Sequence, residues 1–72
     1  MKLTHRQRTI LTLLKTRGHA MPKWSMCADL DIKFITVNTL NRLRDRDCIR
    51  YTDQGWLLTD IGWTAVETGV LP

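Results

Sequence analysis

The fold is decided by residues 33–59, KFITVNTLNRLRDRDCIRYTDQGWLLT, because the spacing of the apolar residues changes within this stretch. In its first half Thr36, Leu40 and Leu43 recur at helical spacing and share one face. This pattern predicts a helix over residues 33–46 with a polar opposite face.

The second half of the stretch is typical of a β-hairpin. Residues 48–51 and 56–59 are short β-prone runs, and Asp53 and Gly55 between them supply turn chemistry. We therefore expect two antiparallel strands within residues 48–59.

A helix is also predicted near the start of the chain. Thr4 and Gln7 have the spacing of a capping box, in which a hydroxyl and an amide side chain satisfy backbone N–H groups reciprocally. Gly18 suits the left-handed conformation that ends a helix. The first helix is therefore expected over residues 4–17.

Two shorter helices complete the predicted secondary structure. One is expected over residues 22–30, because it begins with a proline whose fixed φ and missing N–H suit a first helical turn. The other is expected over residues 60–68, where Thr59 can cap the first turn and Gly62 weakens the helix. Leu71-Pro72 is expected to fray. In the helix over residues 22–30, the candidates for burial are Trp24, Cys27, Ala28 and Leu30.

Length and composition allow one small globular domain. The chain has 72 residues, of which 43% are hydrophobic and 25% are charged, which excludes the disordered and collagen-like classes. No apolar run reaches membrane-spanning length, and the charged N-terminus lacks the apolar core of a signal peptide, so we expect a cytoplasmic protein without membrane association.

Cys27 and Cys48 are expected to be reduced packing residues, with a single disulfide between them as the alternative.

The positive charge of the chain is unevenly distributed. The formal net charge is +4, but residues 1–50 hold all eleven Lys and Arg with only four acids, and residues 51–72 hold three acids and no base. An excess of positive charge of this kind attracts polyanions, although many solvated protein surfaces are equally basic.

The order of these elements resembles that of the winged helix-turn-helix superfamily, including small MarR-type, ArsR-type and phage-type regulators. Residues 40–49, LNRLRDRDCI, are similar to the family's L-x-x-L-x-x-x-G-L-I, with Asp47 in place of glycine. Residues 56–62, WLLTDIG, are similar to its L-T-x-x-G exit from the wing. Asp visits the left-handed region more readily than most residues. The resemblance implies one mainly helical α+β domain over residues 1–72, with the predicted hairpin as its wing.

The resemblance further implies a regulator of transcription, a repressor or other modulator, that binds double-stranded DNA. The helix before the hairpin would enter the major groove, where Asn can bond adenine and Arg can bond guanine. Ile35 is expected to be exposed and able to touch thymine methyl groups, whereas Phe34 is expected to pack against the preceding helix. The predicted base-reading residues are Lys33, Ile35, Asn38, Asn41 and Arg42.

Phosphate contacts are predicted for basic residues that flank the recognition helix, since such contacts position a protein on the duplex. Each of these residues is equally well explained as a solvated surface charge. Arg50 is the only basic residue of the predicted hairpin. The predicted phosphate-binding residues are Arg6, Lys23, Arg44, Arg46 and Arg50.

Other binding and catalytic functions have less support in the sequence. His5 and His19 are isolated, so we expect no metal, and no cofactor or catalytic motif is present, so we expect no enzyme. Trp63 and Val66 of the last helix are candidates for a homodimer contact.

The alternative function is a winged helix that binds protein, as an adaptor or inhibitor of a larger nucleic-acid enzyme. The acidic tip of the short wing, Asp53, and the apolar pair Phe34 and Ile35 favour it.

Overall fold

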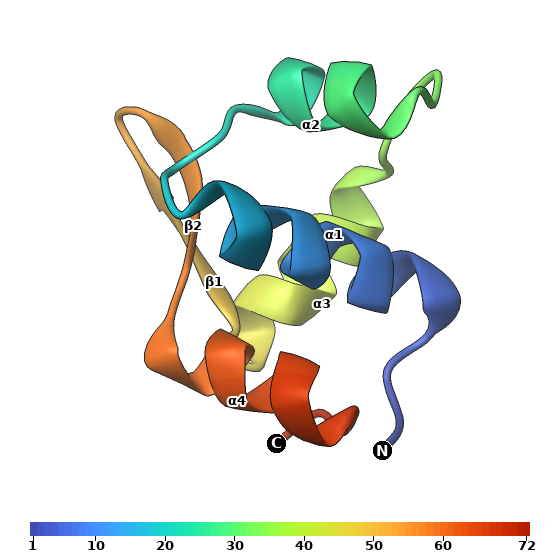
Figure 1. Cartoon of the computed structure of the whole chain (residues 1–72), viewed down its shortest axis with the longest axis vertical. Coiled ribbons are helices and arrows are strands. Elements are labelled where there is room, and N and C mark those ends of the chain that lie inside the picture. Colours follow the sequence, from blue (N-terminus) through green and yellow to red (C-terminus); the bar gives the residue numbers. More distant parts are fainter.

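Helix α1 (His5–Arg17) runs through the middle of the molecule, and the other elements are arranged around it (Figure 1). The computed structural model describes residues 1–72, which form four helices and one two-stranded antiparallel sheet, the mainly helical α+β class expected from the sequence. The other elements are α2 (Lys23–Leu30), α3 (Val37–Asp45), β1 (Ile49–Thr52), β2 (Gly55–Leu58) and α4 (Asp60–Thr68). No helix combines the length and the apolar composition that crossing a membrane requires.

The ends of α1 follow the capping chemistry expected from the sequence. The Gln7 N–H donates to the Thr4 hydroxyl at 3.1 Å, and the Thr4 N–H donates to Gln7 Oε1 at 2.9 Å. Gly18 has a φ of 71° and ends the helix. Both reciprocal bonds of the capping box are present, so the first helix was predicted correctly.

The start of α3 differs from the prediction. The helix begins at Val37, not at Lys33, because the hydroxyl of Thr36 caps it by accepting from the Thr39 N–H at 3.3 Å. A capping residue has extended backbone geometry and cannot also face the core as part of the helix. Ile35, just before the cap, occupies the core position that the prediction gave to Thr36.

The hairpin is extended by a third segment of chain. Strand β1 pairs with β2 in antiparallel register from Ile49 opposite Leu58 to Thr52 opposite Gly55. Met21 then pairs with Trp56 through two backbone hydrogen bonds of 2.9 and 2.8 Å. A Cβ at Gly55 would lie 2.3 Å from the Met21 backbone, so only glycine allows this approach. The link between α1 and α2 is thereby joined to the hairpin.

Helix α2 presents a different face to the core than expected. Met26 is fully buried, and Lys23, Cys27 and Leu30 are half-buried beside it, while Trp24 is 75% exposed. These four inward residues have the spacing i, i+3, i+4, i+7 of one helical face. The prediction that Trp24 and Ala28 are buried was therefore wrong. Both cysteines are free thiols, as expected.

The connection from β2 into α4 lies tightly against the turn that ends α3. Asp47 has a φ of 62°, the left-handed conformation expected for it. The Thr59 hydroxyl donates to the carbonyls of Asp47 and Cys48, and it accepts from the Gly62 N–H at 3.0 Å as the cap of α4. Gly62 is buried against Cys48, so it serves close packing in this helix.

The two ends of the chain pair with each other and close the core (Figure 1). The Leu71 N–H donates to the Met1 carbonyl at 2.7 Å, and the Leu3 N–H donates to the Gly69 carbonyl at 3.0 Å. Leu71 is buried, so the expectation that it frays was wrong. The core consists of Leu3, Ile10, Leu11, Leu14, Met21, Met26, Ile35, Leu40, Leu43, Cys48, Ile49, Ala65 and Leu71.

Candidate nucleic-acid interface

The outward face of α3 is polar and carries three of the predicted base-reading residues. Successive helical residues turn by about 100°, so the face opposite the buried Leu40 and Leu43 is centred on Asn38. Asn41 and Arg42 lie on either side of this centre. Asn38 and Arg42 are exposed, and Asn41 is half-buried. The structure therefore brings these three side chains together on one helix.

The other two predicted base-reading residues lie outside the helix. Lys33 is exposed in the loop before the cap of α3. Ile35 is 1% exposed and belongs to the core, so the prediction that its side chain is exposed was wrong. Phe34, which was expected to pack inward, is 66% exposed. The sequence alone could not assign these adjacent apolar residues, because the path of a loop decides which one turns inward.

A depression of about 390 Å³ lies at the N-terminal end of α3. Arg6 of α1 and Lys33 line it, together with the hydroxyl-bearing Thr36 and Thr39. The two hydroxyl oxygens are hydrogen-bonded to each other at 2.7 Å. Two cationic side chains from separate segments thus meet where the positive end of the α3 dipole lies.

Two basic residues at the C-terminal end of α3 have hydrogen-bond or ion-pair partners within the protein. Arg44 forms a 3.5 Å ion pair with Asp45, and Arg46 donates to the backbone oxygen of Pro72 at 3.0 Å. Arg42 and Arg46 line a shared depression next to Gln7 of α1. Of the predicted phosphate-binding residues, Arg44 and Arg46 therefore already have partners within the protein.

The hairpin and the start of α2 carry the remaining predicted phosphate contacts. Arg50 on β1 is exposed, and Lys23 in the first turn of α2 is half-buried. Tyr51 is exposed and packs edge-on against Trp56, with ring centroids 5.1 Å apart. The acidic tip residue Asp53 is exposed, as expected.

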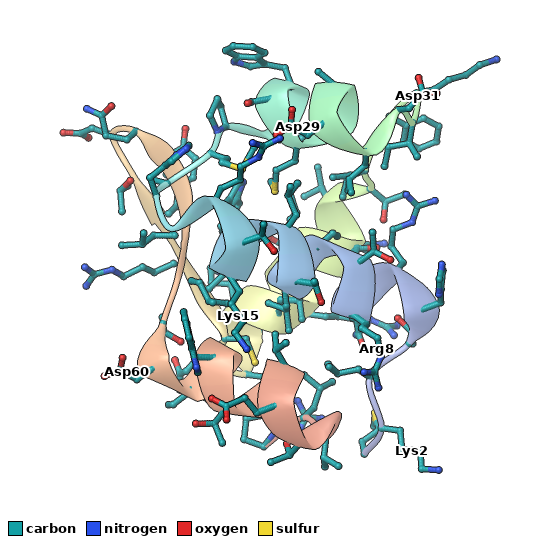
Figure 2. The ribbon with its side chains drawn as sticks, in the orientation of Figure 1. Lys2, Arg8, Lys15, Asp29, Asp31 and Asp60 are labelled. Atoms are coloured by element: carbon teal, nitrogen blue, oxygen red, sulfur yellow. The ribbon has the colours of Figure 1, made fainter.

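Most of the positive charge is not neutralised within the molecule. The ion pairs are Arg17 with Asp29 at 2.9 Å and Arg44 with Asp45 at 3.5 Å, so nine of the eleven Lys and Arg have no Asp or Glu carboxylate within 4.0 Å. Arg8 lies beside the end of α4, close to Gly69 (Figure 2). An unneutralised cation retains its full attraction for a polyanion.

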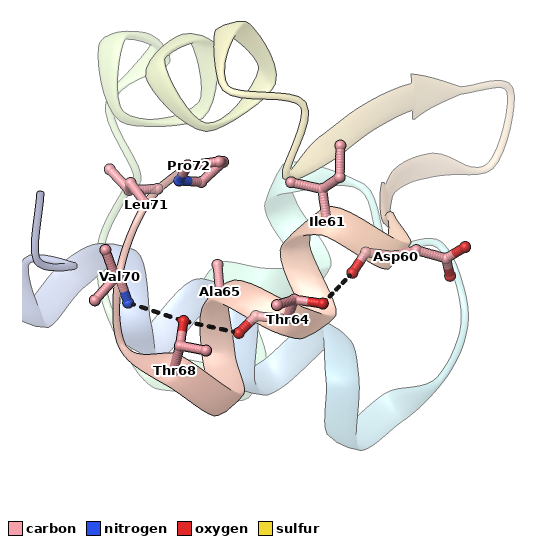
Figure 3. A pocket seen from close by; sticks show the side chains of 8 residues that line it. All are labelled: Asp60, Ile61, Thr64, Ala65, Thr68, Val70, Leu71 and Pro72. Atoms are coloured by element: carbon pink, nitrogen blue, oxygen red, sulfur yellow. Dashed lines mark hydrogen bonds between the residues drawn. The ribbon is translucent and has the colours of Figure 1, made fainter.

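The two candidates for a homodimer contact on α4 differ in exposure, because Trp63 is 45% exposed and Val66 is only partly exposed. Val66 is half-buried against the core, while Trp63 lies beneath the ammonium group of Lys15, 4.7 Å from the ring centroid. A cleft of about 570 Å³ instead lies between α4 and the C-terminal segment, lined by Ile61 and Val70 among others (Figure 3). This cleft was missed, because it depends on the pairing of the chain ends.

Metal-ligating side chains do not gather in this structure. No group of three His, Cys, Asp or Glu residues is placed to hold one ion. His5 and His19 are both exposed.

Comparison of the chain with protein-family models, curated proteins and solved structures gives no match. The functional argument therefore rests on the geometry described above.

Proposed function

We propose that the chain is a winged helix-turn-helix protein that binds double-stranded DNA and regulates transcription, with α3 in the major groove. The observation that carries this proposal is the outward face of α3, where Asn38 and Arg42 are exposed and Arg42 has no ion-pair partner. The fold assignment is supported by the order of the elements and by the pairing of Met21 with the hairpin.

The first two turns of α3 are the part that suits the groove. Asn38 and Asn41 offer the paired donor and acceptor that fit adenine, and Arg42 offers the donors that fit guanine. Asp45 lies in line with Asn38 on the outward face, and its carboxylate would repel phosphates. This acid restricts close approach of DNA to the first two turns, where recognition helices contact base edges.

The phosphate contacts of the proposed complex lie on two sides of α3. Arg6 and Lys33 share the depression at its N-terminal end and would hold one strand. Lys23 and Arg50, on α2 and the hairpin, would hold the other. Lys33 is accordingly reassigned from base contact to phosphate contact. Arg44 and Arg46 contribute less, because binding phosphate would cost each its internal partner.

The test is DNA selection followed by a salt titration. Selection from random duplexes should yield a preferred sequence, bound on the order of 10³-fold more tightly than unrelated DNA. Four phosphate contacts predict that log K falls with log salt at a slope of about −3 to −4 per protomer. Failure to select any sequence would contradict the proposal.

Variants separate the two kinds of contact. Asn38→Ala and Arg42→Ala should each lower specific affinity by about 1–3 kcal/mol and relax the preference at one base pair. The double variant Lys23→Ala, Arg50→Ala should make the slope shallower by about two and leave the preferred sequence unchanged. The matched control is Arg8→Ala, which removes one charge beside α4 and should change neither property.

A second candidate function is binding to a protein, as an adaptor or inhibitor of a nucleic-acid enzyme. Trp24, Phe34 and Tyr51 are the observation that favours it, because all three aromatic side chains are largely exposed. Aromatic residues are enriched at protein interfaces. In that case selection would give no preferred duplex, and a weak, salt-sensitive affinity would be equal for all sequences.

A further inference from the structure

Val37 is an exposed apolar residue at the edge of the polar face of α3. It is the first residue of the helix and is 58% exposed, whereas the other apolar residues of α3, Leu40 and Leu43, are at most 2% exposed. The other large exposed apolar side chains lie on α2, in the loop before α3, on the hairpin, on α4 and near the two ends of the chain. Val37 is therefore the only exposed apolar side chain on the helix proposed to enter the groove.

The position of Val37 joins it to the proposed base-reading face. Residues four apart in a helix lie on the same side, so Val37 neighbours Asn41, and Asn38 follows it directly. Four residues rise by about 6 Å along the helix axis. This distance corresponds to about two base-pair steps of roughly 3.4 Å each. Val37 would face a base pair one or two steps away from the one that Asn41 contacts.

The chemistry of the side chain selects one feature of the major groove. Among the four bases only thymine displays a methyl group there, and apolar side chains contact it. A β-branched residue in a helix has essentially one favoured χ1 rotamer, so the two methyl groups of Val37 are held in place before binding. Contact with a thymine methyl would remove apolar surface of both partners from water at little entropic cost.

We infer that Val37 determines specificity for thymine, by packing its methyl groups on the C5 methyl group of one thymine in the preferred DNA sequence. The inference rests on the proposed function. It replaces the prediction that Ile35 makes such a contact, because the side chain of Ile35 is enclosed in the core.

The test replaces each thymine of the selected duplex in turn with uracil, which removes the methyl group and keeps the base pairing. One replacement should weaken binding of the wild-type protein by about three- to tenfold. Val37→Ala should bind the thymine and uracil duplexes equally. Val37→Thr, which keeps the β-branch and one methyl group, should show an intermediate loss. The sensitive thymine should lie within about two base pairs of the position whose preference changes in Asn41→Ala.

Val70→Ala is the matched control, since Val70 is 43% exposed but lies beside the end of α4. The Val70→Ala protein should lose as much affinity as the wild type when the sensitive thymine is replaced with uracil. If both proteins are folded and uracil replacement lowers the affinity of Val37→Ala as much as that of the wild type, the inference is overturned. A preferred duplex insensitive to every uracil replacement would overturn the inference alone. The absence of any preferred duplex would overturn the proposed function and this inference with it.

Discussion

Gly62→Ala is expected to destabilise the domain, although alanine normally stabilises a helix interior by about 1 kcal/mol relative to glycine. A Cβ at position 62 would lie 2.1 Å from the Cys48 carbonyl oxygen and 2.6 Å from Cδ1 of Leu58. The leucine can rotate away. The carbonyl cannot, because it is backbone and accepts from both the N–H and the hydroxyl of Thr59, each at 3.0 Å.

Relief of the clash therefore requires α4 to move away from the Cys48 turn. Overpacking of this kind costs about 1–3 kcal/mol, and weakening the two hydrogen bonds of Thr59 costs about 1 kcal/mol each. After the gain in helix propensity is subtracted, we expect Gly62→Ala to lower the free energy of unfolding by about 2–4 kcal/mol.

Urea denaturation followed by circular dichroism measures this change. The denaturant slope m should stay constant while the midpoint falls. The control is Thr64→Ala on the exposed side of the same helix, which loses one hydrogen bond to Asp60 and should change stability by less than about 1 kcal/mol. A Gly62→Ala protein as stable as the wild type would refute the close packing of α4 on Cys48.

Leu43→Ala should lower the free energy of unfolding by about 2–5 kcal/mol in the same assay, because Leu43 is fully buried. Asp47→Gly should raise the melting temperature, with a gain of about 1 kcal/mol, because Asp47 has a φ of 62°. Burial, and secondarily the charge of Asp47, raise the pKa of the Cys48 thiol. The native state therefore retains this proton longer than the unfolded state, and stability falls as pH rises through the alkaline range. Cys48→Ala should lose less stability than the wild type between about pH 8 and pH 10 in parallel urea titrations.

The parts of the fold that were predictable from the sequence are those fixed by local chemistry. The Thr4 and Gln7 capping box and Gly18 set both ends of α1 through contacts within a few residues. The hairpin follows from two β-prone runs and a turn. Each of these signals acts between residues that are close in the sequence, so it can be recognised without knowledge of the tertiary packing.

The errors arise where two local patterns compete or where contacts are distant in sequence. Thr36 fits both a helical apolar period and an N-cap, and the cap prevails because its hydroxyl satisfies a backbone N–H. Helix α2 contains two possible inward faces, and burial in the core selects the one with Met26 over the one with Trp24. Burial of Leu71 depends on pairing with Met1 at the other end of the chain, which no local pattern indicates.

The start of α3 at Val37 changes the candidate interface as well as the fold. A helix that began at Lys33 would place that lysine and Ile35 in the groove and would leave Val37 as one interior residue among several. With Thr36 as the cap, Lys33 moves to the depression shared with Arg6, Ile35 enters the core, and Val37 becomes the first residue of the helix. The chemistry that the proposed interface would offer to bases therefore changes from a cation and a flanking isoleucine to a fixed pair of methyl groups beside two amides. Counting charges on the sequence cannot detect this change, because every basic residue is still present and only its position relative to α3 differs.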